Sequence, residues 1–264
     1  MENAFLYHLP AFYLVFPYFI LLVFFNWLGF RYKKRLIKKH PDLDPVGLGT
    51  AEGSLLGLTA LLLSFAFGMS ASKFDTRRQL IVEEANNIGT TILRCDLYPD
   101  SIRNLFRADL KNYLEARIDY YDAGDNNNLI QASLLRSDSL SGLCWKRAAS
   151  LSHDPANYVA TLQMVPSLNA TIDIVTTRDA SRRAIVPRLI LDVLSMLTLV
   201  SAFLSGYGGK SNDRNKVLVV AFAFMTTLAL YLVIDLDTPR QGYINLNTVE
   251  QLMVNLRTNF SGNK

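Results

Sequence analysis

The chain has 264 residues, of which 50% are hydrophobic and only 19% are charged, and its formal net charge is +4. Its mean hydropathy of +0.16 is typical of a membrane protein with a sizeable part in water. The positive charge is spread around the membrane flanks, and no run of Lys and Arg interleaved with aromatic residues forms a separate face, so the pattern favours interfacial anchoring over a nucleic-acid-binding surface.

Four uncharged or nearly uncharged runs are each long enough, at about 1.5 Å per helical residue, to cross a hydrocarbon layer of about 30 Å. They cover residues 11–30, 53–72, 189–207 and 217–234. We expect the first run to be a signal anchor, because no Lys or Arg precedes it and no small-residue cleavage site follows it. The sequence therefore predicts an all-α integral membrane protein with four transmembrane helices.

The second run continues without Pro or a turn cluster into a charged helical pattern at residues 73–93. This continuity predicts one rigid helix that leaves the membrane and enters a helical extramembrane domain. The predicted organisation is 1–72 for the first two spans and their basic connecting loop, 73–184 for the extramembrane domain, 185–236 for the last two spans, and 237–264 for a C-terminal extramembrane segment.

The extramembrane segment shows only helical periodicity. Apolar residues recur at helical spacing before Pro99, and Ser101 is a plausible N-cap for the helix that follows. We expect a third helix at about 129–151 and a fourth at 156–184 that is broken at Pro166.

The second span has two contrasting faces. One is a stripe of small residues that would let another helix approach closely: Gly57, Ala60, Ser64, Gly68 and Ala71. Roughly opposite lie the bulkier Leu58, Leu62, Phe65 and Met69. These four side chains either contact lipid or the protein core, or form stacked apolar rings if several copies surround an axis.

Charged residues gather at the membrane face next to the extramembrane domain, because an even number of crossings separates the span ends on that side. The cations are Lys73, Arg77, Arg78, Arg182, Arg183 and Arg188, and the acidic residues are Asp192, Asp235 and Asp237. Arg188 and Asp192 are spaced i,i+4, which suits a salt bridge. The set is either a group of interfacial ion pairs that holds the helices together or a charged vestibule at the mouth of a pathway.

Catalytic groups are poorly represented. His8, His40 and His153 are scattered and have no metal-ligand spacing, so we expect no metal and no cofactor. Cys95 and Cys144 are far apart in the chain and are either buried free thiols or, in an oxidising compartment, a disulfide. An intramembrane enzyme would need a polar catalytic pair, and the candidates within the spans are few: Asp192, Ser64, Ser195, Thr198 and Ser201. We therefore expect no enzymatic activity.

Two segments resemble the bestrophins. LLGLTALLLSFAFGMSASKFDTRRQLIVEEANNIGTTILR, residues 55–94, is similar to the second membrane helix and following helix of bacterial bestrophins and of the bacterial bestrophin-like family. IDLDTPRQGYINLN, residues 234–247, stands where those proteins have an acidic turn after their last span. The resemblance implies a homopentameric, anion-selective (chloride-type) channel in the bacterial inner membrane, with the bilayer and small anions as its other partners.

The resemblance also implies roles for particular residues. Leu58, Leu62, Phe65 and Met69 would line the apolar neck of the pore. Asp235 and Asp237 match the location of the calcium clasp of eukaryotic bestrophins but lack its full acidic run, so we expect no calcium site. An alternative from another class is a membrane-anchored sensor or scaffold that binds a partner and conducts nothing. A pore requires a closed ring of subunits, and a scaffold does not.

The two criteria for orientation disagree. Short basic loops favour the cytoplasm, and both the 31–39 segment and the loop with Lys210, Arg214 and Lys216 are basic. This count predicts a periplasmic helical domain. The resemblance implies a cytoplasmic one, as in the bestrophins.

Overall fold

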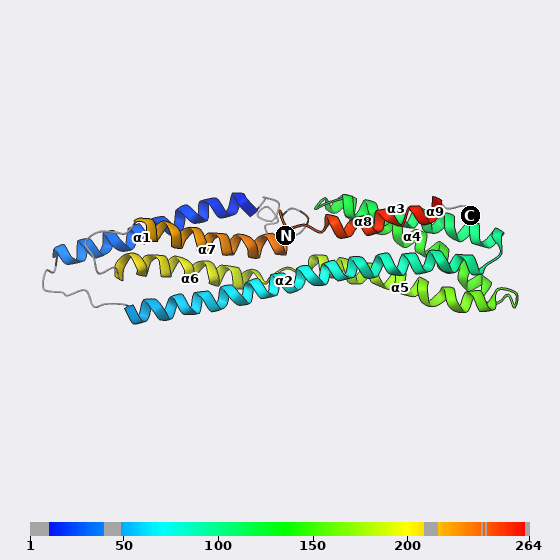
Figure 1. Ribbon diagram of the computed structural model, residues 1–264, viewed down its shortest axis with the longest axis horizontal. Helices are drawn as coiled ribbons and strands as arrows, with labels where there is room; N and C mark the ends of the chain where they lie inside the picture. The colour runs from blue at the N-terminus through cyan, green and yellow to red at the C-terminus, as the bar shows by residue number, and fades with distance from the viewer. Residues whose placement is uncertain (1–10, 40–48, 209–215, 239, 241, 262–264) are drawn as a thin grey trace. The chain divides into compact units, whose positions relative to one another are not determined.

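The computed structural model describes residues 11–39, 49–208, 216–238, 240 and 242–261, and every regular element within them is a helix (Figure 1). The all-α prediction is confirmed, and four described segments are long and apolar enough to cross a membrane. In chain order the elements are α1 (Ala11–Lys39), α2 (Gly49–Arg94), the 3-10 helix η2 (Cys95–Leu97), α3 (Asp100–Asp122), α4 (Asn127–Leu151), α5 (Tyr158–Arg183), α6 (Arg188–Gly208), α7 (Lys216–Asp237), α8 (Asn247–Asn255) and α9 (Thr258–Ser261).

The chain divides into two compact units. The first contains the described residues of Met1–Lys73 and Ile185–Ile244, and the second contains Phe74–Ala184 and the described residues of Asn245–Lys264. The 46-residue helix α2 contributes its first half to the first unit and its second half to the second unit. The C-terminal helices α8 and α9 belong to the second unit.

The first unit consists of apolar helices that are joined by a few polar contacts. Helix α1 packs along α6 and α7. The Tyr18 hydroxyl on α1 donates to the Ser195 carbonyl on α6 at 3.1 Å, and the Asn26 amide donates to the Ala202 carbonyl at 3.1 Å. Because lipid offers no competing hydrogen-bond partners, such contacts help to fix which faces of two membrane helices meet.

Two glycines determine how closely α1 and α6 approach. A Cβ atom added to Gly29 would overlap the Phe203 carbonyl, and one added to Gly206 would overlap the Asn26 carbonyl. Small residues at such a crossing bring two backbones into direct contact.

The second unit has one main hydrophobic core. The core is formed by the buried faces of α2, α3, α4 and α5 together with Met253 of α8; its fully buried members include Ile88, Phe106, Leu114, Cys144 and Met164. These side chains pack the second half of α2 against the helices that follow it. The helical periodicity that precedes Pro99 in the sequence is thus the inner face of α2.

Two local predictions for this unit were wrong, and the start of a third helix differs from the prediction by two residues. Helix α3 begins at Asp100 with Pro99 at the N-cap position and no side-chain cap, so Ser101 is not the cap. Helix α4 begins earlier than expected, because the Asn126 side chain accepts from the backbone N–H groups of Asn128 and Leu129. Helix α5 continues through Pro166, whose exposed ring is flanked by buried Met164 and Ser167.

Candidate functional site

In its membrane-spanning half, one side of helix α2 packs against other helices of the same chain. Thr59, Ala66 and Ser70 lie on this side and are at most 5% exposed. The Thr59 hydroxyl lies 3.2 Å from the Ser201 hydroxyl of α6, and Ala66 packs in a cluster with Leu194 of α6. This side of α2 is therefore occupied by contacts within the chain.

The opposite side of α2 is open in the single chain. Gly57, Ala60, Ser64 and Gly68 of the small-residue stripe are exposed, and Ala71 is half-buried. A Cβ atom added to Gly57 or Gly68 would meet no atom within 4 Å. The stripe therefore does not serve the packing of α2 within the subunit.

The four residues predicted for the neck are divided between two environments. Phe65 is 61% exposed and Leu58 is 46% exposed, so both side chains are open. Leu62 packs against the cluster of Ala66, Leu194, Leu230 and Val233, and Met69 is half-buried. The structure thus brings Leu58 and Phe65 together on the open flank of α2 and turns Leu62 towards the core.

Two of the predicted vestibule cations bind backbone carbonyl groups. The Lys73 ammonium donates to the Ile185 carbonyl within the first unit. Within the second unit the Arg77 guanidinium donates to the carbonyls of Ser181 and Ala184 at 3.3 and 2.9 Å. These carbonyls belong to the last turn of α5, where the helix dipole favours a cation.

Arg182 and Arg183 share one carboxylate, that of Asp179. Arg182 lies 3.0 Å and Arg183 lies 2.6 Å from the oxygens of Asp179. These hydrogen bonds lower the pKa of Asp179 against the opposing effect of its burial. Arg78, in contrast, is exposed and forms no ion pair with the described residues. Arg183 is also exposed, but it is held by Asp179.

The expected salt bridge between Arg188 and Asp192 is not formed among the described residues. Arg188 is the first residue of α6, and both side chains are exposed. Asp235 and Asp237, in contrast, are 1% and 5% exposed.

The two acidic residues at the end of α7 fix the turn that follows it. The Asp235 carboxylate accepts from the backbone N–H groups of Tyr243 and Ile244 at 3.0 and 2.8 Å. A Cβ atom added to Gly242 would lie 2.6 Å from Asp235 Oδ1, so only glycine allows the chain to pass this close. Asp237 accepts from the Val186 N–H at 2.9 Å and ties the start of α6 to the end of α7.

These contacts do not fit a calcium site. Calcium needs six to eight oxygen ligands, but both Asp235 oxygens already accept backbone hydrogen bonds. Among the residues that the structure describes, no three His, Cys, Asp or Glu side chains are grouped so that they could hold a metal ion. His8 and His40 lie outside the described residues.

A cluster of buried charges in the second unit was not predicted from the sequence. Glu84 of α2, Arg117 of α3 and Arg178 of α5 form a cluster inside the second unit, with exposures of 0%, 0% and 6%. Arg117 Nε donates to Glu84 Oε1 at 2.5 Å, and Arg178 donates to the other carboxylate oxygen. One feature of the sequence could have indicated that Glu84 is buried: it falls at helical spacing between the core residues Ile81 and Ile88.

Aromatic rings also make cation–π contacts with the arginines of this cluster. The Arg117 guanidinium lies 4.5 Å from the centre of the Tyr120 ring, and that of Arg178 lies 4.6 Å from the centre of the Tyr121 ring. Burial alone would raise the pKa of Glu84, but the two guanidinium groups lower it below its usual value. The carboxylate is therefore ionised and ties α2 to α3 and α5.

The two cysteines are free thiols in the main core of the second unit. Burial raises the pKa of both Cys95 and Cys144 to about 12. Because only the thiolate is a nucleophile, neither residue is suited to covalent chemistry.

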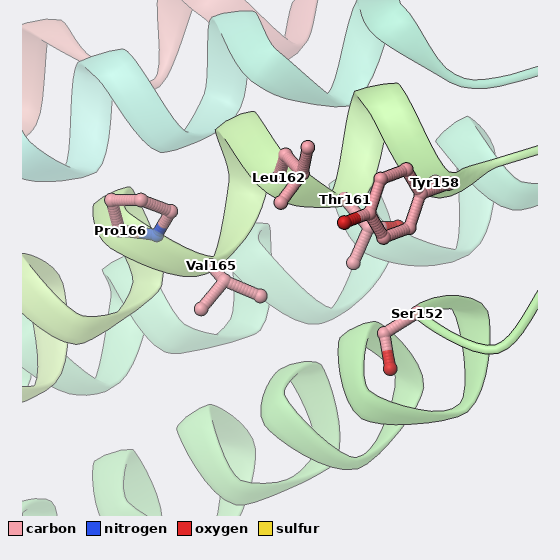
Figure 2. Close-up of a pocket in the computed structure, with 6 residues that line it drawn as sticks. All are labelled: Ser152, Tyr158, Thr161, Leu162, Val165 and Pro166. Carbon is pink, nitrogen blue, oxygen red and sulfur yellow. The ribbon is translucent and has the colours of Figure 1, made fainter.

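One pocket lies on the surface of the second unit (Figure 2). It has a volume of about 210 Å³, and Ser152 at the end of α4 faces five residues of α5 across it. Those five are Tyr158, Thr161, Leu162, Val165 and Pro166. The lining contains no ionisable catalytic pair, so the pocket suits an apolar group and not a reaction.

Comparisons with known proteins agree with this architecture. The model of the bestrophin-like domain matches residues 20–250. A crystal structure of a bacterial bestrophin homologue from Klebsiella pneumoniae, solved by Zn-SAD phasing, is similar with a TM-score of 0.72 and 14% identity over 95% of this chain and 100% of that one. A point variant of that homologue gives a TM-score of 0.74 and 14% identity over 96% and 98% of the two chains. No curated protein sequence matches.

Proposed function

This chain belongs to the bestrophin-like family, and we propose that it forms a homopentameric, anion-selective channel in the bacterial inner membrane. The observation that supports this proposal is the open side of α2. A membrane helix with a small-residue stripe is suited to close contact with another helix, yet Gly57 and Gly68 have open space around them in the single chain. Neighbouring copies of the chain in a ring would supply the missing contact.

The pore would be lined by α2. Leu58, Leu62, Phe65 and Met69 form the proposed neck, and the open side chains of Leu58 and Phe65 are its principal constriction. Apolar rings of this kind resist wetting and so raise the barrier to ion entry. Leu62 would support the neck from behind, because it packs against the core of its own subunit.

Anion preference would come from cations near the extramembrane end of α2. Arg78 and Arg183 are the exposed members of the proposed vestibule, but Arg183 pairs with Asp179, and Lys73, Arg77 and Arg182 are likewise held by carbonyl or carboxylate groups. A ring of like charges at a pore mouth concentrates ions of opposite sign. The cations that are held by carbonyl or carboxylate groups would add to the same electrostatic potential from fixed positions.

The test is anion flux in proteoliposomes, with two aromatic residues of α2 compared. Phe65→Ala should increase flux because it removes a bulky ring from the neck, while Phe67→Ala should leave it unchanged. Phe67 is a matched control: it is 44% exposed and lies on the other flank of the same helix. Increased flux from Phe67→Ala alone would show that the proposed neck is on the wrong flank.

The selectivity of the flux provides a second readout. Arg78→Gln should lower the preference for anions over cations without increasing the total flux, because it changes the potential and not the width of the path. Lys146→Gln is the control, since Lys146 is an exposed cation of α4. The absence of flux from a verified pentamer would contradict the channel proposal.

The second candidate is a non-conducting scaffold or sensor, and the pocket between α4 and α5 favours it. Tyr158 and Leu162 on its lining are 51% and 53% exposed, so an apolar group of a partner could contact them. A stable monomer or dimer in a native-like bilayer would favour this candidate over the channel.

A further inference from the structure

The exposed side of α1 changes from apolar to basic within one helical turn. Up to Leu28 the exposed large residues are hydrophobic: Phe16 59%, Ile20 53%, Phe24 49%, Trp27 38% and Leu28 38%. After Leu28 the exposed side chains are mainly cations: Arg31, Lys34, Arg35, Lys38 and Lys39. Residues three, four and seven positions apart share a helix face, so Phe24, Trp27, Arg31, Lys34 and Lys38 form one continuous strip.

Ring stacking and cation–π contacts connect the apolar part of this strip with its basic part. The rings of Phe24 and Trp27 stack with centres 5.8 Å apart, and the Arg31 guanidinium lies 5.1 Å from the centre of the Trp27 ring. One turn further on, the Lys34 ammonium lies 4.7 Å from the centre of the Phe30 ring. Trp favours the depth at which acyl chains meet headgroups, so Arg31 and Lys34 would lie at the depth of the phosphates.

Helix α6 covers a different side of α1 at this level. The backbones meet at Gly29 and Gly206, and Tyr32 lies near the rings of Phe203 and Tyr207. Because this crossing occupies one side of α1, the basic strip on the exposed side faces away from α6. Helix α1 contains no Asp or Glu, and none of the five exposed cations forms an ion pair within the described part of the chain.

We propose that this basic strip is a binding site for the phosphate groups of anionic phospholipids, with the acyl chains lying along the apolar strip below it. The planar guanidinium of Arg31 suits bidentate contact with a phosphate, and Lys34 and Lys38 add positive charge on the same face. A free phosphate or a soluble anion would use the cations alone. The continuity of the strip with Phe24 and Trp27 favours a ligand that has both an anionic head and an apolar tail. The proposal does not depend on conduction.

Trp27 can report on the lipid beside it, because the chain has only two tryptophans. In a Trp145→Phe background, Trp27 is the single indole. The protein is placed in nanodiscs with equal amounts of phosphatidylglycerol and phosphatidylcholine, and either one or the other has brominated acyl chains that quench nearby Trp fluorescence. Brominated phosphatidylglycerol should quench Trp27 more strongly, since each cation near the surface favours an anionic lipid by about fivefold.

Three variants decide whether the strip is responsible. Arg31→Gln, Lys34→Gln and Arg35→Gln together should make the two lipids quench equally, while Arg31→Lys with Arg35→Lys should retain most of the preference. Lys111→Gln with Lys146→Gln removes exposed cations of the helical unit and should change nothing. If the triple variant does not fold, high salt on the Trp145→Phe protein should lower the preference instead. Equal quenching in that background, or a preference that survives both treatments, would overturn the proposal.

Discussion

Glu84 supplies one negative charge for two buried guanidinium groups, and the rings of Tyr120 and Tyr121 add cation–π contacts. Removing one partner of a buried charge cluster is costly, because the remaining charges stay buried without compensation. We predict that Glu84→Gln lowers the free energy of unfolding of the helical unit by about 3–5 kcal/mol. Glu115→Gln is the matched control: Glu115 pairs with Arg257 at 2.6 Å but on the surface, and such pairs are worth about 1 kcal/mol or less.

The same cluster predicts a dependence on pH. The folded-state pKa of Glu84 is lowered, so its contribution is fully present above the pKa of about 4.3 that a Glu has in an unfolded chain. The contribution is lost as the pH falls through the lower folded-state value. The difference in thermal stability between the unaltered protein and Glu84→Gln should therefore persist from pH 7 down to about pH 4.5 and shrink only below that. A difference that shrinks between pH 7 and pH 5 would argue against an ionised Glu84.

Asp235 holds the turn after α7 through two backbone N–H groups, and its removal leaves both donors without an acceptor. We predict that Asp235→Ala costs about 2–6 kcal/mol in thermal unfolding experiments, at about 1–3 kcal/mol for each of the two unsatisfied donors. Asp192→Ala and Arg188→Ala should both change stability by less than about 0.5 kcal/mol, because the two exposed side chains do not pair. None of these values should depend on calcium. A clear calcium-dependent shift that disappears in Asp235→Ala would show that the turn binds the ion.

At the scale of whole elements, the sequence predicted most helices because their signals are local. Long apolar runs identified the four spans, and the spacing of Ile81, Ile88 and Ile92 identified the buried side of α2. The failures came from tertiary contacts. Pro166 does not break α5, because buried side chains on both sides of it hold the helix against the core. The buried role of Glu84 depends on Arg117 and Arg178, which are distant in the chain and which no local pattern connects to it.

The contact between α1 and α6 is another feature that no local pattern revealed. We predict that Gly206→Ala lowers the melting temperature of the purified protein, because a Cβ atom there must displace the backbone of Asn26. Gly142→Ala is the control: a Cβ atom on Gly142 of α4 meets nothing within 4 Å, and Ala is favoured over Gly in a helix by about 1 kcal/mol. Equal melting temperatures for the two variants would mean that the helices do not cross at Gly206.

At the scale of the whole molecule, the candidate site is incomplete in one chain. Leu58, Phe65 and the small-residue stripe of α2 are open, and only an assembly of several chains would enclose them. The sequence could therefore indicate which helix would line the proposed pore but could not reveal which of the four proposed neck side chains are open and which pack against the core. That division follows from Ala66, which places Leu62 beside Leu194 and Leu230 and leaves Phe65 on the open flank.

The predicted orientation of the molecule rests on the same basic segment that we propose binds anionic lipid. Short basic loops favour the cytoplasm, so we predict that the 31–39 segment is cytoplasmic and that the helical unit is periplasmic. Thiol labelling is a poor probe, because Cys95 and Cys144 are buried and burial raises their pKa to about 12. Reporters inserted after Asp125, in the turn between α3 and α4, avoid this difficulty. A periplasm-active phosphatase should be active there and a cytoplasm-active fluorescent protein should be dark, with the same reporters at Lys39 giving the opposite pattern. The reverse result at both positions would show that the protein has the orientation implied by its resemblance to the bestrophins.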